Sequence, residues 1–318
     1  MIARTIISDS LRPIAVFLDD PAVNEVMVNG NGAVFVEKSG VIARAQTGAV
    51  PLNLSPDMTM MAIRALASTM GREIRSGGEN QILDANYDDL RIAAAVPPVS
   101  PDGPSMSIRK HSRREMTFDD YIRDGTMTQP QANYLAGVVH EGHHSILISG
   151  GTSTGKTTFL NALAKHIPDD ARVLTVEDTL ELNITVPDLS RFRTDARNGF
   201  TYRRLVQHCM RSRPDRVIAG ELRGAEAFDV LDAMNTGHGG IMTTIHANDA
   251  HMALIRMSSL VAMGLPEGSN WTIETIRDFI GQLVGVVVSV VRINGVRRVN
   301  EIVHVKGYEN GKFQFEKT

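Results

Sequence analysis

An α/β fold in two domains is predicted by the alternation of apolar runs and helical patterns after about residue 130. Runs rich in β-branched residues occur at 145–149, 172–176, 216–220, 241–245 and 283–291. Helical or loop patterns separate these runs, so we expect a mostly parallel sheet with helices on both faces. Ligands of such sheets bind at the carboxyl ends of the strands. The predicted second domain covers residues 131–318.

A smaller mixed α/β domain is predicted for residues 1–130. Two β-rich runs, NEVMVNG and AVFVEKSG, are separated by Asn29-Gly30-Asn31-Gly32, which favours a hairpin. A helix is expected from Ser55-Pro56-Asp57, because a serine cap followed by proline is typical of a helix start. The segments LRIAAAVPPVS and SMSIRKHS predict two strands around a loop. Polar and charged residues at about 110–130 predict the linker between the domains.

Composition and charge argue against several classes of protein. Of the 318 residues, 42% are hydrophobic and 22% are charged, as in soluble globular proteins. A net charge of −3 argues against wrapping of nucleic acid, so direct nucleic-acid binding is not expected. The most apolar run, LVGVVVSVV, is far shorter than the ~20 residues of a membrane-spanning helix, and its valines favour a buried strand. With no secretory signal and one cysteine, Cys209, we expect a cytoplasmic protein, at most peripheral to a membrane.

The strongest motif is SILISGGTSTGKTTFLNAL, residues 145–163, in which a G-x-x-x-x-G-K-T pattern follows a β-rich run. This pattern predicts a phosphate-binding loop, whose backbone N–H groups and following helix surround the phosphates of a nucleoside triphosphate. Lys156 is expected to reach the β- and γ-phosphates, and the Thr157 hydroxyl to bind Mg²⁺. The predicted ATP-binding residues are Gly150, Gly151, Thr152, Ser153, Thr154, Gly155, Lys156, Thr157 and Thr158.

Carboxylates follow two of the predicted strands. Glu221 ends the apolar run of RPDRVIAGELRG, where it could hold a metal-bound water or act as a base. The alternative is a surface glutamate that caps the next helix. The segment TVEDTLEL supplies Glu177, Asp178 and Glu181, which could orient water or metal ligands, or simply form a solvated turn. His246 follows a third β-rich run, where a neutral imidazole could sense the γ-phosphate, although a lone histidine is usually structural.

The order of the phosphate loop, VEDTLEL, RPDRVIAGELRGAEAFDVL and TGHGGIMTTIHAN resembles the secretion-ATPase superfamily of type II secretion, type IV pili and type IV secretion. The amino-terminal segments VNEVMVNGNGAVFVEKSG and SMSIRKHS are similar to its conjugation and type IV secretion branch. The resemblance runs from about Asp20 to Val303. It implies a RecA-like phosphate-loop NTPase domain, a hexameric ring, and nucleotide bound between the two domains of one subunit. The partners that it implies are inner-membrane components of a transfer channel.

The resemblance also implies roles for individual residues. Glu221 corresponds to the Walker B motif, Glu177 and Asp178 to the acidic box, and His246 to the histidine box. Arg91 and Arg109 match positions from which arginines of the amino-terminal domain approach the nucleotide. The sequence departs from the pattern directly before Glu221, where Ala219-Gly220 stands without an aspartate. Metal binding would then rest on Thr157, water and the acidic box, with Asp178 as the candidate ligand.

Together these features predict an ATPase that drives a membrane-embedded transfer channel or pilus assembly. Glu221 would activate water with help from Glu177, while His246 would couple phosphate occupancy to domain closure over Arg91 and Arg109. Two alternatives stay open: a nucleic-acid translocase on a similar core, and a nucleotide-gated scaffold with little turnover. A GTPase is disfavoured because no N-K-x-D segment occurs, and nothing indicates the acceptor pocket of a small-molecule kinase.

Overall fold

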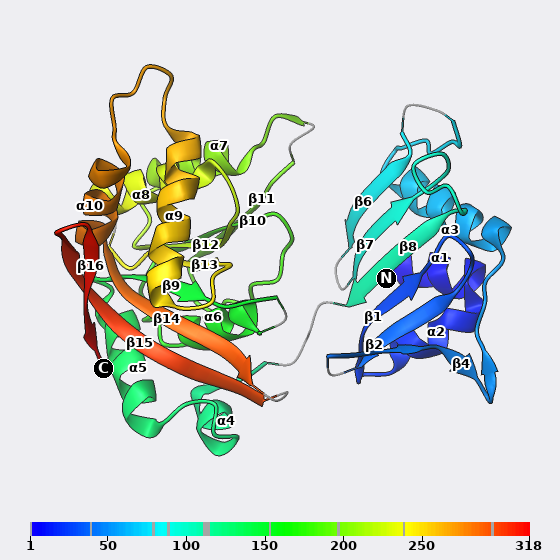
Figure 1. The fold of residues 1–318 in the computed structure, drawn as a ribbon, viewed down its shortest axis with the longest axis horizontal. Helices are drawn as coiled ribbons and strands as arrows, with labels where there is room; N and C mark the ends of the chain where they lie inside the picture. Colours follow the sequence, from blue (N-terminus) through cyan, green and yellow to red (C-terminus); the bar gives the residue numbers. More distant parts are fainter. Residues whose placement is uncertain are drawn as a thin grey trace. The chain divides into compact units, whose positions relative to one another are not determined.

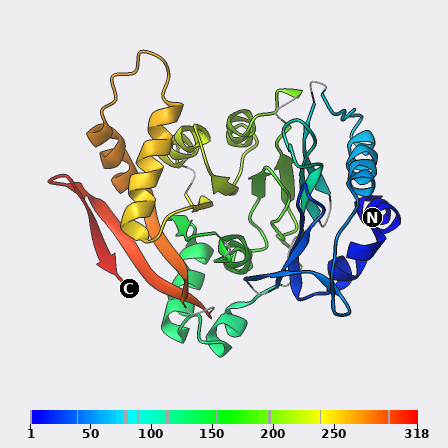
Figure 2. The ribbon, with the colours of Figure 1, turned by 45° about the vertical axis from the view of Figure 1, so that its right-hand side comes forward.

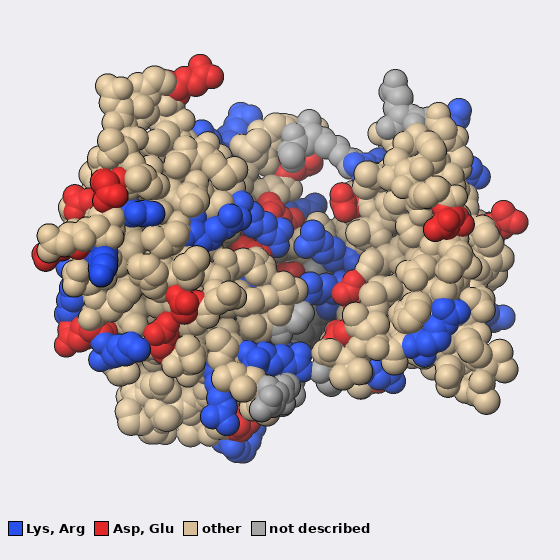
Figure 3. All heavy atoms as spheres, in the orientation of Figure 1, with Lys and Arg blue, Asp and Glu red and all other residues tan. Residues whose placement is uncertain are grey.

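The structure is a computed structural model that describes residues 2–38, 40–77, 80–87, 90–110, 115–152, 154–195, 198–237, 239–293 and 296–318. Its internal contacts divide the chain into two compact units, residues 1–114 and residues 115–318 (Figure 1). Figure 3 shows basic and acidic side chains mixed over the face that it presents, as expected for a net charge of −3. Within the described ranges, no helix has the length and apolar character needed to cross a membrane.

The first unit is an antiparallel sheet with helices on one face. Its six strands lie in the order β3-β2-β1-β8-β7-β6. The strands are β1 (Val23–Val28), β2 (Val34–Lys38), β3 (Val41–Arg44), β6 (Ile82–Tyr87), β7 (Leu90–Ala95) and β8 (Ser105–Lys110), and a small ladder joins β4 (Gln46–Thr47) to β5 (Val50–Pro51). The helices are α1 (Ile2–Ser10), α2 (Arg12–Asp19) and α3 (Pro56–Thr69). Figure 2 shows these helices on one side of the sheet, where Ile7, Ile14 and Ile63 are fully buried in a common core.

The amino-terminal features expected from the sequence are present. Strands β1 and β2 pair as a hairpin, with Val28 opposite Val34. Helix α3 begins at Pro56, and the Ser55 hydroxyl accepts a hydrogen bond of 3.2 Å from the N–H of Met58. This cap satisfies one of the backbone donors that every helix start leaves unpaired.

The second unit contains an eight-stranded sheet in the order β11-β10-β12-β13-β9-β14-β15-β16. The first six strands of this order are parallel to their neighbours, and β15 and β16 add an antiparallel edge. The strands are β9 (Ser145–Ser149), β10 (Val173–Glu177), β11 (Leu189–Arg193), β12 (Arg216–Leu222), β13 (Met242–Ile245), β14 (Val284–Ile293), β15 (Val296–Glu309) and β16 (Lys312–Lys317). All five predicted strands are therefore confirmed. The predicted, mostly parallel arrangement of the sheet is confirmed as well.

Helices cover both faces of this sheet. One hydrophobic cluster joins it to α7 (Tyr202–Met210), α8 (Glu226–Asn235), α9 (Ala250–Gly264) and α10 (Ile273–Leu283). A second cluster joins the opposite face to α4 (Phe118–Arg123), α5 (Gln129–Glu141) and α6 (Lys156–Ala164). Alternate residues of β9 enter different clusters, because successive side chains of a strand point to opposite faces.

Residues 115–130, which the sequence analysis assigned to the linker, fold as part of the second unit. Thr117 forms a capping box with Asp120 at the start of α4, and Thr128 forms one with Gln131 at the start of α5. The ring of Tyr121 lies 5.4 Å from the ring of Phe159 on α6. The polar composition of this segment thus comes from helix caps and exposed helix faces, while its few apolar residues pack on the sheet domain.

Candidate nucleotide-binding site

The phosphate loop connects the carboxyl end of β9 to the start of α6, as the sequence predicts. Gly155 has a φ of 91°, a left-handed conformation that favours glycine, and is followed directly by helix α6. A Cβ atom at Gly150 would lie 2.5 Å from the carbonyl oxygen of Val290, so only glycine fits against β14. Thr152 is exposed and Thr154 buried, while Ser153 lies outside the described residues.

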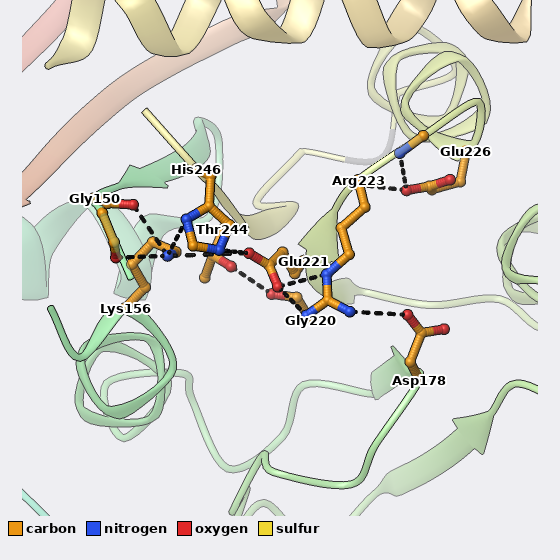
Figure 4. A network of polar contacts seen from close by, with 11 residues as sticks. Gly150, Lys156, Asp178, Gly220, Glu221, Arg223, Glu226, Thr244 and His246 are labelled. Atoms are coloured by element: carbon orange, nitrogen blue, oxygen red, sulfur yellow. Dashed lines mark hydrogen bonds and ion pairs between the residues drawn. The ribbon is translucent and has the colours of Figure 1, made fainter. Parts of the chain in front are cut away.

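The Lys156 side chain is folded back onto the loop. It is only 8% exposed, and its ammonium donates to the carbonyl oxygens of Gly150 at 3.0 Å and Gly151 at 3.2 Å. A third neighbour is Nδ1 of His246, at 3.4 Å (Figure 4). The ammonium thus rests on uncharged acceptors at the position where the phosphates of a bound nucleotide are expected.

Glu221, near the carboxyl end of β12, lies at the centre of a cluster of cations and donors (Figure 4). Its Oε1 atom is 2.9 Å from Nε2 of His246 and 4.0 Å from Nζ of Lys156. Its Oε2 atom accepts a hydrogen bond of 2.8 Å from Nε of Arg223. The structure therefore brings Lys156, Glu221 and His246 together, from three separate segments of the chain.

The contacts of His246 favour a neutral ring that carries its proton on Nε2. An ammonium can only donate, so the contact with Lys156 assigns the acceptor role to Nδ1 and the N–H to Nε2, which faces Glu221. Burial lowers the pKa of His246 below its ordinary value of 6.5, and the positive charge of Lys156 lowers it further, against the opposing effect of Glu221. The ring can therefore link the lysine to the carboxylate without a charge of its own.

Arg223 extends the cluster toward the acidic segment after β10. Its Nη1 atom lies 3.8 Å from Oδ2 of Asp178, whose Oδ1 accepts a hydrogen bond of 2.9 Å from the Thr194 hydroxyl. The backbone N–H of Arg223 donates to the Glu226 carboxylate at 2.7 Å. Glu226 thereby binds the backbone just before α8, and Glu221, which sequence reasoning alternatively placed as a cap of this helix, makes no cap there.

Glu177 ends β10 and is bound by the backbone of the segment that follows this strand. It is 3% exposed, and its Oε1 accepts hydrogen bonds of 2.8 Å from the N–H groups of both Glu181 and Leu182. Burial raises the pKa of Glu177 above its ordinary value, although the two N–H donors act in the opposite direction. A Cβ atom at Gly220 would lie 3.3 Å from Cγ of Glu177, so an aspartate directly before Glu221 would crowd this buried side chain.

The comparisons with known proteins agree with this geometry. A family model described as "Type II/IV secretion system protein" matches residues 8–292. The chain belongs to this family. The conjugal transfer protein TrbB of Rhizobium radiobacter is 35% identical over 311 residues, which cover 95% of this chain and 90% of TrbB. The predicted membership of the secretion-ATPase superfamily and the similarity to its conjugation branch are thus confirmed.

Solved structures of secretion ATPases share the fold. The VirB11 ATPase of the Brucella suis type IV secretion system, solved in complex with sulphate, is 28% identical with a TM-score of 0.51 and covers 95% of this chain and 97% of its own. The Legionella pneumophila ATPase DotB has a TM-score of 0.63 at 16% identity over 96% of this chain and 81% of its own, which shows the fold alone. The RecA-like fold of the second unit is confirmed.

Mg²⁺, the ion that a secretion ATPase uses with ATP, fits the start of α6. The Thr157 hydroxyl is half-buried and makes no hydrogen bond to a described residue, so it is available as a ligand. Mg²⁺ usually keeps several waters and takes other oxygens from the phosphates, so few protein ligands suffice. Asp178 fits less well, because Thr194 and Arg223 already occupy its carboxylate. Among the described residues, no three His, Cys, Asp or Glu side chains form a metal site by themselves.

Arg91 and Arg109 lie side by side in the first unit of this secretion-family chain. Arg91 of β7 is the register partner of Arg109 of β8, so both project from the same face of the sheet, and both are exposed. On the other side of Arg109, its partner on β1 is Glu25. This face is opposite to the one that the helices cover. The approach of the two arginines to a nucleotide stays a prediction.

Sequence reasoning missed one member of the cluster, Arg223. It stands two residues after Glu221 in the segment GELRG and contacts both Glu221 and Asp178. An arginine directly after a strand that ends in a carboxylate was the available signal, because short spacing at a strand end keeps the two side chains within reach.

Proposed function

We propose that this protein hydrolyses ATP to ADP and phosphate at the loop 150–158. The observation that carries the proposal is the chain of contacts from Lys156 through His246 to Glu221. It joins a phosphate-binding cation, a neutral imidazole and a carboxylate at the carboxyl ends of β9, β13 and β12, the edge of a parallel sheet where ligands bind. Membership of the secretion system family supports the same conclusion.

Lys156 changes partners when nucleotide binds. In the structure its ammonium donates to two neutral carbonyl oxygens. Phosphate oxygens are charged and therefore stronger acceptors, and the start of α6 favours the same anion. We expect the ammonium to leave Gly150 and Gly151 for the β- and γ-phosphates, with small motion of the loop itself.

Glu221 positions and activates the attacking water. Arg223 binds Oε2 by a hydrogen bond and Nε2 of His246 lies 2.9 Å from Oε1, so the two side chains fix the position of the carboxylate that acts as the base. When Lys156 moves to the phosphates, Oε1 loses the ammonium that lies 4.0 Å away. The oxygen is then a better acceptor for the proton of a water aligned with the γ-phosphate.

His246 couples phosphate occupancy to the rest of the subunit. One ring nitrogen contacts Lys156 and the other contacts Glu221, so the departure of the lysine changes the hydrogen bonding of the whole ring. We propose that this change accompanies closure of the domains around ATP, and that release of phosphate reverses it.

The other predicted site residues have supporting roles in ATP hydrolysis. Mg²⁺, held by the Thr157 hydroxyl when bound, supplies positive charge that offsets the charge of the phosphates. Glu177 acts as a positioning residue, since its carboxylate fixes the backbone at 181–182, and Asp178 orients Arg223. Arg91 and Arg109 provide cations from the first unit that offset charge developing on the transferred phosphoryl group.

We further propose that the protein works as a hexameric ring that powers conjugal transfer or type IV secretion. Its partners are then other copies of this chain and the inner-membrane components of a transfer channel, and its place is the cytoplasmic side of the inner membrane. The names of the relatives TrbB and VirB11 support this role, because they describe conjugal transfer and type IV secretion.

The test is the ATP hydrolysis rate per subunit as a function of protein concentration. Wild type is compared with Lys156→Ala, with Glu221→Gln and with Glu267→Gln, an exposed glutamate in the loop after α9 that serves as control. We expect a specific rate that rises as subunits associate, is lost in the first two variants and is retained in the third. A flat rate would contradict the ring, and a wild-type rate equal to that of Lys156→Ala would indicate a scaffold. A rate that rises on adding single-stranded DNA would indicate a nucleic-acid translocase.

A further inference from the structure

We infer that Arg297 is a second phosphate-binding cation of the site, directed at the two phosphates that ATP and ADP share. The inference rests on the proposed function, since it concerns the same loop. It adds a residue from the antiparallel edge of the sheet, far from the motifs in the sequence.

The β14–β15 hairpin lies beside the phosphate loop. Strand β14 is the parallel neighbour of β9, with Ser289 in register with Ser149, and its next carbonyl, of Val290, packs against Gly150. Arg297 is near the start of β15, in register with Arg292 on β14. The pairing therefore brings the start of β15 close to the loop.

The Arg297 side chain lies against Gly155. A Cβ atom at Gly155 would be 3.1 Å from Nε of Arg297 and 3.3 Å from Cζ. Gly155 directly precedes Lys156 and stands at the start of α6, where backbone N–H groups point toward the phosphates. The guanidinium of this exposed arginine thus lies beside the backbone that surrounds the ligand.

The strand fixes the direction of this side chain. Arg297 and Val299 share one face of β15, and Val299 is buried in the same cluster as Phe159 and Leu160 of α6. The N–H of Val299 also donates to the carbonyl of Thr126 at 2.8 Å, which anchors the strand. Arg298, on the opposite face, points away from α6.

Arg297 is exposed, and among the described residues no carboxylate pairs with it. Within the part of the chain that the structure describes, its guanidinium makes no hydrogen bond or ion pair, in contrast to Arg223, which contacts Glu221 and Asp178. An arginine, a lysine and the positive end of a helix repel one another at short range. An anion between them removes this repulsion, and the forked guanidinium suits phosphate oxygens.

The sheet order shows which phosphates Arg297 can reach. Glu221 and His246 belong to β12 and the end of β13, on one side of β9, whereas β14 and β15 lie on the other side. Water that Glu221 activates approaches from the β13 side and attacks the γ-phosphate. Arg297 therefore serves the opposite end of the polyphosphate, which is not transferred and is common to substrate and product.

An interaction made equally with substrate and product lowers KM without raising kcat. Loss of one charge-assisted contact to phosphate is expected to weaken binding about 10- to 100-fold. We therefore expect Arg297→Ala to raise the Kd for ADP and the KM for ATP by similar factors while kcat changes little. Arg297→Lys retains the charge and should recover part of the affinity.

The test measures by calorimetry the Kd of Mg-ADP and of Mg-pyrophosphate for wild type, Arg297→Ala, Arg297→Lys and Arg298→Ala. The last variant removes an equal charge one residue away on the other face of β15. We expect Arg297→Ala to weaken both ligands by a similar factor, and Arg298→Ala to resemble wild type, with unchanged thermal midpoints. Steady-state kinetics of the same proteins supply KM and kcat.

Three results would overturn the inference. Wild-type affinity of Arg297→Ala for ADP would remove the contact, and so would equal weakening by Arg298→Ala. A loss for ADP with unchanged pyrophosphate binding would mean that Arg297 contacts the base or ribose instead. If wild type binds neither ligand, the proposed function fails with the inference. If ADP binding depends on Arg297 but ATP is not hydrolysed, only the proposed function fails.

Discussion

Two glutamates lie at or next to the carboxyl ends of neighbouring strands of the parallel sheet, and their surroundings differ. Glu177 of β10 is turned into the protein, where the backbone N–H groups of residues 181 and 182 hold its carboxylate. Glu221 of β12 is held instead by the side chains of Arg223 and His246, and its side chain is 18% exposed. Both residue type and position along the sheet are nearly the same.

The difference suggests the hypothesis that the partners of a carboxylate, and not its place at a strand end, determine its role. Backbone donors cannot move without rearranging the loop, so we expect Glu177 to have a structural task. Side-chain partners can be exchanged when a ligand arrives, so we expect Glu221 to change its contacts during a reaction. The following predictions test this contrast, from the largest expected effect to the smallest.

Glu221→Gln should lower kcat at least about 100-fold, because an amide cannot accept the proton of the attacking water. Binding of ADP should change little, since in the proposed mechanism Glu221 serves the γ-phosphate, which ADP lacks. Steady-state hydrolysis and ADP calorimetry on the same preparation check both statements. The matched variant Glu177→Gln should keep most of its turnover. An equal loss of kcat in the two variants would show that both carboxylates take part in the chemistry. The proposed difference between Glu177 and Glu221 would then be wrong.

The sequence predicted the parts of this site that depend on local chemistry. The loop from Gly150 to Thr157 needs its glycines and lysine at fixed spacing, and the apolar runs before Glu221 and Glu177 identify their strands. The direction of Glu177 depends on the chain folding back after β10, where the Asn161 side chain contacts Glu181 and Asn183. No local sequence pattern predicts that contact.

Arg297 was beyond sequence reasoning for a similar reason. It is separated from Gly155 by more than half of the second unit, and only the pairing of β14 with β9 and β15 brings the two together. The sequence shows that no aspartate stands directly before Glu221, but it does not show what glycine contributes at that position. Gly220 leaves room for the buried Glu177 side chain, which no spacing rule describes.

Glu177→Ala should destabilise the second unit by about 1–3 kcal/mol, since it leaves two backbone N–H groups without their acceptor. Glu177→Gln keeps an acceptor oxygen and should be at least as stable as wild type at neutral pH. Burial raises the pKa of Glu177, so the folded wild type loses stability as pH rises from about 4.5 through the folded pKa. Thermal melts between pH 4.5 and 7 should therefore show that the midpoint of Glu177→Gln rises relative to that of wild type as the pH increases. A constant difference would mean that the carboxylate is not desolvated.

The ratio kcat/KM should fall on acidification, through a pKa below 6.5, because this ratio reports the free enzyme, in which protonated His246 can no longer accept a hydrogen bond from Lys156. The pKa of His246 is lowered, so the neutral form prevails at pH 7 and is lost only as pH drops through that lower value. His246→Gln should lose about tenfold in kcat and flatten this acid limb. His143→Gln, an exposed histidine before β9, is the control and should keep the wild-type profile. An acid limb that survives in His246→Gln would assign the titration to another group.

Gly220→Ala should have the smallest effect, about 1 kcal/mol of stability, because the new methyl group meets Cγ of Glu177 at 3.3 Å and the side chain must shift. The shift strains the hydrogen bonds of Glu177 to residues 181 and 182, while the contacts of Glu221 with Arg223 and His246 are not touched. Chemical denaturation should show the loss, and kcat should stay near the wild-type value. In Glu177→Ala the obstructing side chain is absent, so Gly220→Ala should then cost little. If the two changes were instead additive, the space at Gly220 would serve some other purpose than housing Glu177.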